Sequence, residues 1–409
     1  MSNKNNSYNI VSFGARDYYQ VAIALNNAGL LHKYITDFYC PKLLRGIIKK
    51  RYVVDLNGNK TLSLYLFSLL QFVFRGNGSK KLIDFIFGFL SGLYNYFTTN
   101  KAIVYSYYLD GFLTFYRIFN LKPKVLICFQ VHPTPWFINQ IVEEDDKSFS
   151  LYYKINFKRD VEFKYTQKDI ERYKMSLSQV HRVICASSVT ARSIFIDGLP
   201  QIKYDVIPYG SKFNVTESIS SSTFSYSVDK KIKLLTVCQL TQRKGLHWAF
   251  KAMSELNCRG KFEWIVVSNN LDESIIKLAP DNVRIISAVA GDDLANLMAQ
   301  ADLFVMPSLI EGFGLVYIES LSMGTPILYT QNTGPFDFVT HGVHGIEVKV
   351  SSIEDLKNAF ENISNGVIDL SAMRNDCKKI ASEFNWLNFR LGVVNSVLNL
   401  EKHMELVRN

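Results

Sequence analysis

Short apolar runs alternate with segments of helical periodicity along the first half of the chain. Runs rich in β-branched and aromatic residues predict strands at 8–13, 103–106, 124–130, 182–186 and 204–207. Between the first two runs, the spacing predicts a helix over 17–28 that ends at Gly29. Strands that are apolar on both faces and separated by helices form a parallel sheet covered on both sides. This half is therefore predicted to be a doubly wound α/β domain.

A second β/α series begins at Lys231, after a Ser- and Thr-rich segment, 211–227, that indicates a linker. Strands are predicted at 232–238, 262–268, 283–286, 303–306, 326–329 and 346–350. Helices are predicted near 245–257, 292–300, 315–322 and 353–362. A closing helix is predicted over 386–406 from apolar residues at helical spacing: Leu387, Leu391, Val394, Val397 and Leu398. Two Rossmann-like domains with parallel sheets should therefore face a central cleft, where such folds bind ligands.

Length and composition are those of a folded protein with two cores. The chain has 409 residues, of which 48% are hydrophobic and 20% charged, so it can bury enough apolar surface to offset the entropy of ordering. Its six cysteines lack a CxxC spacing and its polar first residues show no export signal, which favours a cytoplasmic protein. The apolar segment 61–74 is too short to span a membrane, and 82–97 contains Asp84. Neither is predicted to be transmembrane.

The net positive charge of the chain comes from its first half. Residues 1–210 hold 27 basic and 15 acidic residues, a net charge of +12, whereas residues 211–409 have a net charge of −3. Within 42–101, basic residues alternate with Leu, Phe and Tyr; they include Lys49, Lys50, Arg51, Arg75, Lys80 and Lys81. This mixture suits an anionic membrane surface, such as the inner face of the plasma membrane. A solvated face of ordinary helices remains the alternative.

The segment 306–326 carries the most informative motif, MPSLIEGFGLVYIESLSMGTP. It predicts a strand, a glycine-bearing loop and a helix whose first backbone N–H groups, near Gly314 to Val316, can bind phosphate. Gly312 and Gly314 let a phosphate approach the backbone closely. Glu311 precedes this anion site and Glu319 lies further along the helix. Two carboxylates around one anion site fit a nucleotide sugar.

The E-x7-E spacing of Glu311 and Glu319, within EGFGL-x-x-x-E-x-x-x-x-G-T-P, resembles retaining GT-B glycosyltransferases of family 4. The resemblance implies that Glu311 contacts the donor sugar near the reacting centre and that Glu319 binds the ribose. It further implies that the diphosphate and donor are held by the loop and the first helical turn, namely Gly312, Phe313, Gly314, Leu315 and Val316.

A second resemblance lies in the segment 234–245, LLTVCQLTQRKG, where the family has a strand, then G-R-L, then K-G at a helix start. A cation there neutralises the departing diphosphate, and Lys244 matches that position. Gln239 stands where the family has an arginine. The cation pair is therefore incomplete unless Arg243 turns inward to replace that arginine.

The first domain carries weaker resemblances. His132 follows the predicted strand 124–130 and is similar to the family histidine that contacts the donor sugar. Gly14 lies in the first β/α turn, where it can admit a phosphate or the acceptor, although no GxGxxG is present. The segments 182–188 and 206–210 resemble the strand, serine and interdomain hinge of the family.

The resemblance implies an enzyme that transfers a sugar from a UDP- or GDP-linked donor to a hydroxyl of a saccharide or lipid-linked saccharide, with retention of configuration. Residues 1–210 would form the acceptor-side domain and 211–385 the nucleotide-sugar domain, with the closing helix, 386–409, packed back on the first. Glu311, His132 and Lys244 would act in catalysis. The expected setting is surface polysaccharide biosynthesis, with the protein cytoplasmic or peripheral on the inner membrane face.

Other chemistries have less support. The acids at 143–146 and 292–293 lack the Asp-x-Asp form of a metal-bound nucleotide site and are expected to be surface charge, while His341 and His344 lack a third ligand. No metal, cofactor or nucleic-acid partner is predicted. A sugar-nucleotide 2-epimerase and a glycogen phosphorylase would share the fold. The first should have a different set of acids and histidines, and the second would need a pyridoxal-binding lysine in a much longer chain. A catalytically silent sugar-nucleotide-binding subunit of a polysaccharide assembly complex remains the alternative that Gln239 keeps open.

Overall fold

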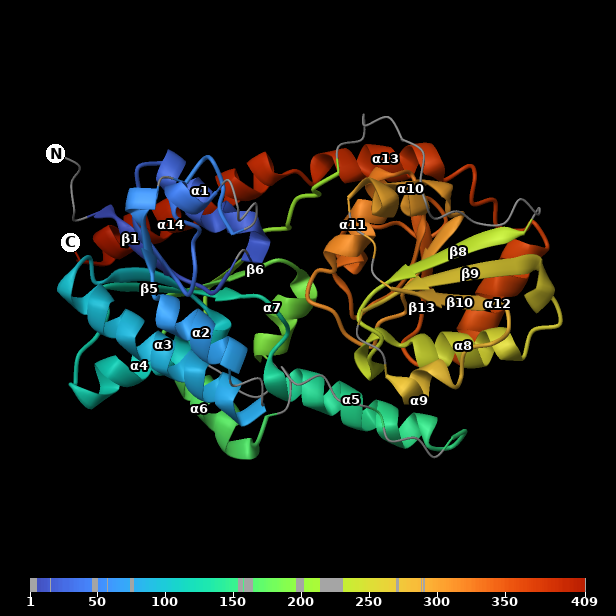
Figure 1. Ribbon diagram of the computed structural model, residues 1–409, viewed down its shortest axis with the longest axis horizontal. Helices are drawn as coiled ribbons and strands as arrows, with labels where there is room; N and C mark the ends of the chain where they lie inside the picture. The colour runs from blue at the N-terminus through green and yellow to red at the C-terminus, as the bar shows by residue number, and fades with distance from the viewer. Residues whose placement is uncertain are drawn as a thin grey trace.

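Two parallel sheets form the centres of two layered α/β domains (Figure 1). The computed structural model describes residues 6–14, 16–45, 51–56, 58–73, 77–153, 157, 165–195, 202–213, 231–269, 272–287, 289 and 291–408. Every strand pairing in these residues is parallel. The predicted fold class, two doubly wound α/β domains, is confirmed.

The first sheet has the order β3-β2-β1-β4-β5-β6-β7. Its strands are β1 (Tyr8–Val11), β2 (Leu31–Thr36), β3 (Thr61–Ser63), β4 (Lys101–Tyr105), β5 (Val125–Gln130), β6 (Arg182–Cys185) and β7 (Tyr204–Val206). Its helices are α1 (Gln20–Asn27), α2 (Tyr65–Val73), α3 (Asn77–Phe97), α4 (Leu109–Ile118), α5 (Pro135–Phe149), α6 (Gln167–Leu177) and α7 (Ser188–Phe195). All six residues of β5 are buried, as a strand covered on both faces requires.

The second sheet has the order β10-β9-β8-β11-β12-β13. Its strands are β8 (Ile232–Val237), β9 (Phe262–Val267), β10 (Val283–Ile286), β11 (Leu303–Val305), β12 (Ile327–Thr330) and β13 (Gly345–Val348). Its helices are α8 (Leu246–Ser254), α9 (Glu273–Ile276), α10 (Asp292–Gln300), α11 (Leu315–Ser322), α12 (Ile353–Ser364) and α13 (Arg374–Glu383). In both sheets the strand order reverses beside the first strand, where doubly wound folds bind ligands.

The sequence pattern missed two strands and misplaced one helix start. β2 contains the half-buried His32 and Lys33, and β3 has three residues at the sheet edge, so neither forms a continuous apolar run. The helix predicted over 17–28 begins at Gln20, because Asp17, Tyr18 and Tyr19 have φ angles of 47°, 51° and 63°. The Asp17 carboxylate accepts hydrogen bonds from the Tyr105 hydroxyl and the Val21 N–H, which stabilises this left-handed segment.

The chain passes between the domains twice, and the two crossings lie side by side. The Ser211 N–H donates to the Phe384 carbonyl, and a Cβ on Gly210 would lie 2.4 Å from the Trp386 nitrogen. Of the predicted linker 211–227, residues 214–227 lie outside the described residues. The closing helix α14 (Trp386–Arg408) then returns along the first domain beside α1 (Figure 1).

The closing helix is confirmed, but three of the five apolar positions that predicted it are exposed. Leu387, Leu391 and Leu398 are exposed. The buried positions are Phe389, Val393, Val397 and Leu400. Polar contacts add to this packing, since the Glu401 carboxylate accepts from the Tyr8 hydroxyl at 3.0 Å and from Lys101 Nζ at 2.6 Å.

We expect Glu401→Ala to lower the free energy of unfolding by about 1 to 3 kcal/mol, because both donors lose their acceptor in a partly buried site. Urea unfolding followed by circular dichroism measures the change. Glu405→Ala, on an exposed position of the same helix, is the matched control and should change stability by less than about 0.5 kcal/mol. Equal unfolding midpoints for the two variants would contradict this role of Glu401.

Candidate active site

Two loops meet at the carboxyl ends of β8 and β11, which are neighbours in the second sheet. Gly245, at the end of the β8–α8 loop, has φ 70°, and a Cβ there would lie 1.9 Å from the Pro307 carbonyl oxygen. The Leu309 N–H donates to the Arg243 carbonyl at 2.8 Å. Glycine therefore allows the two loops to pack backbone against backbone, which brings Arg243 and Lys244 beside the β11–α11 loop.

The contact between these loops is a buried ion-pair cluster around Glu311. The Arg243 guanidinium donates to Glu311 Oε2 at 2.7 Å, and Lys244 Nζ forms an ion pair with the same oxygen. Both cationic side chains are only 11% exposed, so Arg243 does turn inward. Burial alone would raise the pKa of Glu311, but the charges of Arg243 and Lys244, with a contribution from His132, hold that pKa far below its ordinary value.

The first turn of α11 lies directly after this cluster. Gly314 has φ 76°, and a Cβ there would lie 2.6 Å from the Tyr317 ring, so a side chain at this position would clash. No side chain caps the helix start. Gly314, Leu315 and Val316 are partly exposed, whereas the rest of α11 is buried. The backbone N–H groups of this turn can therefore bind an anion beside Arg243 and Lys244.

The second carboxylate of the motif, Glu319, is also buried and has one cationic partner. Lys212 Nζ lies 3.2 Å from Glu319 Oε1. Burial raises the pKa of Glu319, and Lys212 offsets part of that rise. Lys212 was not predicted from the sequence, because it follows the hinge and meets Glu319 only when the two domains are folded together.

The first domain contacts the β11–α11 loop through the ends of β5 and β6. A Cβ on Gly312 would lie 2.7 Å from the Val131 carbonyl oxygen and 3.4 Å from the His132 Cα. The Ser187 hydroxyl donates to the Gly312 carbonyl. His132 thus lies across from Glu311, and its ring meets the Tyr107 ring edge-on at 6.1 Å.

The other three predicted site residues differ in exposure and packing. Gln239 is exposed. The Phe313 side chain packs in the hinge against the rings of Tyr209, Phe338 and Phe384, so its contribution is to the core. Gly14 lines a cavity of about 400 Å³ in the first domain, where its N–H donates to Asp37 and its carbonyl accepts from Tyr34.

Asp145 was expected to be surface charge, and this prediction was wrong. The side chain is buried and accepts hydrogen bonds from Gln242 at 2.8 Å and Trp248 Nε1 at 2.6 Å, and it lies 3.0 Å from His247 Nε2. Figure 1 shows α5, which carries Asp145, extending from the first domain along the second. The signal was helical spacing: Asp145 shares the buried face of α5 with Ile138, Val142 and Phe149.

The remaining acids and histidines form no metal site among the residues that the structure describes. The His341 ring accepts from the Glu347 N–H and the His344 ring accepts from the Thr340 N–H, so both histidines stabilise a turn. None of the described helices is long and apolar enough to cross a membrane.

Known proteins are similar to this chain in fold and, over its second domain, in sequence. The chain superposes on sucrose-phosphate synthase from Thermosynechococcus elongatus with a TM-score of 0.65, covering 97% of this chain and 100% of that one, at 14% identity. It superposes on Anabaena HepE, solved with UDP and glucose, with a TM-score of 0.61, covering 96% and 100% at 14% identity. The fold is GT-B.

A family model matches the second domain of this GT-B chain. Residues 231–365 match the family described as Glycosyl transferases group 1. A lipopolysaccharide core biosynthesis glycosyltransferase, LpsE of Rhizobium meliloti, is 31% identical over 133 residues, 32% of this chain and 38% of the relative. An amylovoran biosynthesis glycosyltransferase, AmsK of Erwinia amylovora, is 24% identical over 42% of this chain and 47% of the relative. Each of these two alignments covers less than half of the relative's length.

We expect Asp145→Ala to lower the free energy of unfolding by about 3 to 5 kcal/mol at pH 7, because Gln242, His247 and Trp248 lose a buried charged acceptor. Burial raises the pKa of Asp145, but its hydrogen-bond donors outweigh burial and lower it overall. The advantage of the wild type over the variant should therefore be complete above about pH 5 and shrink as the pH falls below about 4.

Thermal and urea unfolding across this pH range test the Asp145 prediction, with Glu143→Ala, on the exposed face of α5, as the control. A stability difference that stays constant from neutral to strongly acidic pH would show that the carboxylate charge has no role.

Proposed function

We propose that the protein is a retaining glycosyltransferase of the family 4 type, which moves a hexose from a nucleotide sugar to a hydroxyl of a saccharide or lipid-linked saccharide. The observation that carries the proposal is the convergence of Arg243 and Lys244 on the buried Glu311, beside the uncapped start of α11. Two cations and a helix N-terminus form a strong site for a diphosphate. Relatives named for lipopolysaccharide and amylovoran biosynthesis favour a role in surface polysaccharide assembly.

In this proposal, the donor diphosphate binds the first turn of α11 and accepts charge-assisted hydrogen bonds from Arg243 and Lys244. The bond between the anomeric carbon and the phosphate oxygen breaks, and its electron pair goes to that oxygen, where the two cations stabilise the new charge. The acceptor hydroxyl attacks the same face of the sugar and releases its proton to the departing phosphate oxygen. Glu311 and His132 orient the sugar, and Glu319 accepts from the ribose hydroxyls.

We propose that Arg243 replaces the arginine that the family has at the position of Gln239. Its guanidinium lies within 2.7 Å of the same Glu311 oxygen that Lys244 contacts, so the loop supplies two cations despite the exposed Gln239. This arrangement favours an active transferase over a silent binding subunit. UDP in the HepE structure favours a nucleotide diphosphate as the group that these residues bind.

We expect Lys244→Ala and Glu311→Gln each to lower the rate of sugar transfer by about 100-fold or more, because each removes a charge that acts on the leaving group or the donor sugar. Thermal shift with UDP-, GDP- and ADP-sugars identifies the donor, and sugar release into water measures turnover. Lys251→Ala, on an outer position of α8 paired with Glu255, is the matched control. Rates like those of the wild type in both site variants would refute the assignment, and a donor that binds without any turnover would favour the silent subunit.

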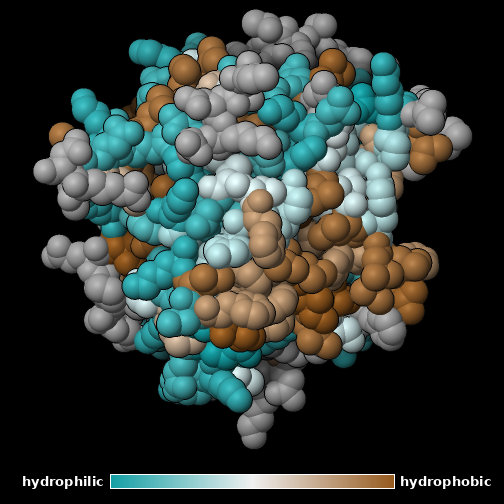
Figure 2. All heavy atoms as spheres, turned by 90° about the vertical axis from the view of Figure 1, so that its left-hand side faces the viewer, coloured by the Kyte–Doolittle hydropathy of each residue, from teal (hydrophilic) through white to brown (hydrophobic). Residues whose placement is uncertain are grey.

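We further propose that the first domain binds the inner face of the plasma membrane. An apolar face covers neighbouring parts of α2 and α3, and Figure 2 shows apolar side chains gathered on this side of the domain. Its exposed members are Leu69, Phe72, Leu82, Ile86, Leu90, Leu93 and Phe97. Lys80 and Lys81 adjoin this apolar face, and the first half of the chain has a net charge of +12, which complements anionic lipids. Of the basic residues predicted to contribute, Lys49, Lys50 and Arg75 lie outside the described residues.

We expect the double variant Leu69→Asp, Phe72→Asp to bind vesicles of phosphatidylcholine and phosphatidylglycerol at least about tenfold more weakly than the wild type, because both side chains are more than half exposed and lose their apolar contact with lipid. Co-sedimentation measures the binding. Leu391→Asp, Leu398→Asp, on the exposed side of α14, is the control. Unchanged binding of the α2 variant would contradict the apolar face as the contact.

A further inference from the structure

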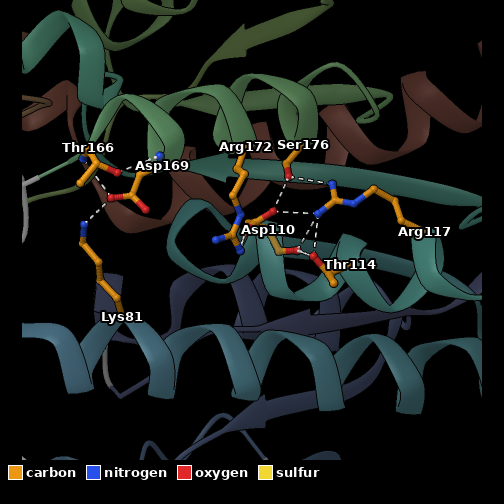
Figure 3. Close-up of polar contacts among 8 residues, drawn as sticks. All are labelled: Lys81, Asp110, Thr114, Arg117, Thr166, Asp169, Arg172 and Ser176. Atoms are coloured by element: carbon orange, nitrogen blue, oxygen red, sulfur yellow. Dashed lines mark hydrogen bonds and ion pairs between the residues drawn. The ribbon is translucent and has the colours of Figure 1, made fainter.

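A cavity of about 440 Å³ lies in the first domain between α3, α4 and α6. Two ion pairs connect the helices that form it (Figure 3). Lys81 on α3 lies 2.9 Å from Asp169 at the start of α6, and Arg172 on α6 lies 2.5 Å from Asp110 on α4. Asp110 also accepts from Arg117 at 2.8 Å. Four of the charged side chains that line the cavity are therefore paired with one another across the three helices.

The lining carries charges of both signs in equal number. Its cations are Lys80, Lys81 and Arg172, and its carboxylates are Asp84, Asp110 and Asp169. A ligand with a net charge of either sign would meet as much repulsion as attraction here. A purely apolar ligand would displace water from these charged groups and offer them no hydrogen bonds in its place. The lining thus favours a neutral ligand with many hydroxyl groups.

Aromatic rings complete the walls. Phe85, Tyr107, Tyr165 and Tyr173 line the cavity. Lys81 Nζ lies 4.8 Å from the Tyr165 ring centre, and the Arg172 guanidinium lies 5.3 Å from the Phe85 ring centre, so polar groups and flat apolar surfaces alternate. A sugar ring presents apolar C–H faces and a polar hydroxyl edge. Rings that stack on the faces, together with charged groups that hydrogen bond to the edge, match both surfaces of such a ligand.

The cavity continues toward the candidate active site. A smaller cavity shares Ser106, Tyr107, Tyr165 and Tyr173 with it and extends to His132. A third, of about 400 Å³, shares Lys80, Asp84 and Tyr107 and extends to Gly14. The cavity that reaches His132 has a volume of about 20 Å³, room for a water molecule and not for a sugar. The third cavity has room for a sugar unit, so a disaccharide can occupy the two large cavities beside Tyr107, whose ring lies 6.1 Å from that of His132.

We propose that the cavity between α3, α4 and α6 is a subsite that binds a neutral sugar unit of the acceptor, at least one residue away from the hydroxyl that reacts beside His132. This inference rests on the proposed function, because it makes the ligand an acceptor rather than a product or an effector. The protein then selects acceptors that already contain two or more sugars. Binding in the subsite positions the acceptor chain, while the cluster around Glu311 acts on the donor.

The test compares acceptor lengths in the wild type and in Tyr165→Ala. Methyl glycosides of glucose, galactose, mannose and N-acetylglucosamine, with their di- and trisaccharides, are the probes, and saturation-transfer NMR with calorimetry measures binding. At least one trisaccharide should bind the wild type tenfold or more tightly than its methyl glycoside. Tyr165→Ala should lose that gain without changing affinity for the methyl glycoside, and Tyr165→Phe, which keeps the ring, should retain it.

Two further variants keep the result interpretable. Tyr204→Ala, on an exposed edge strand of the same domain, is the control and should keep the length dependence. Lys81→Ala, at an exposed position of the rim, should reduce the gain even if Tyr165→Ala does not fold. The proposal is overturned if no probe gains affinity with length, or if Tyr165→Ala and Lys81→Ala keep the full gain. Sugar release from the donor in water reports separately on the proposed function, since it needs no acceptor, and its absence from the wild type would refute that function while the binding results still test the cavity.

Discussion

A buried carboxylate needs compensating charge, and this requirement organises the second domain around Glu311. Moving an isolated carboxylate out of water costs several kcal/mol even after the protein relaxes. Arg243 and Lys244 compensate that cost from a different loop, and without Glu311 their two charges would repel each other at close range. The β8–α8 and β11–α11 loops therefore stabilise each other's charged residues. In the proposed function, the arriving diphosphate takes over part of that compensation.

Close backbone packing makes this charge cluster possible. Long side chains at the loop contact would hold the two loops apart, whereas Gly245 lets the backbone of one reach the Pro307 carbonyl of the other. On the other side, Gly312 allows the β11–α11 loop to approach the end of β5, near His132. The parallel sheets position these loops, because the carboxyl ends of all strands in a parallel sheet lie at the same edge. The site is thus formed mainly by loops whose positions the sheets determine.

The first domain contributes differently, through contacts that cross the cleft and through cavities of its own. Asp145 on α5 joins α8 by buried hydrogen bonds, so the helix that begins three residues after His132 also packs on the second domain. This contact links the position of the β8–α8 loop to that of the first domain. The cavities around Tyr107 lie on the other side of His132, between helices of the first domain. In the proposed function, the donor and the acceptor therefore lie on opposite sides of this histidine.

Local patterns in the chain were enough to predict the two doubly wound domains, most of the strands and the residues around Glu311. Apolar strands, helical spacing and the glycine-rich loop are local signals, and they lie within short windows of the chain. Its local patterns did not reveal β3, a three-residue edge strand, or the left-handed turn before α1, which depends on the Tyr105 hydroxyl from another strand. Local spacing also failed to separate the buried and exposed sides of α14, because apolar residues occur on both.

Which charged residues meet depends on how distant segments pack. The sequence left open whether Arg243 turns inward, and it indicated surface charge at Asp145; packing against Glu311 and α8 buries both. Lys212 reaches Glu319, and Lys81 reaches Asp169, across separations of about a hundred residues. The energy of a charge depends on its distance to other charges and on its burial. Neither quantity exists until distant segments are packed together, so the sequence can name candidate groups, but only the fold selects their partners.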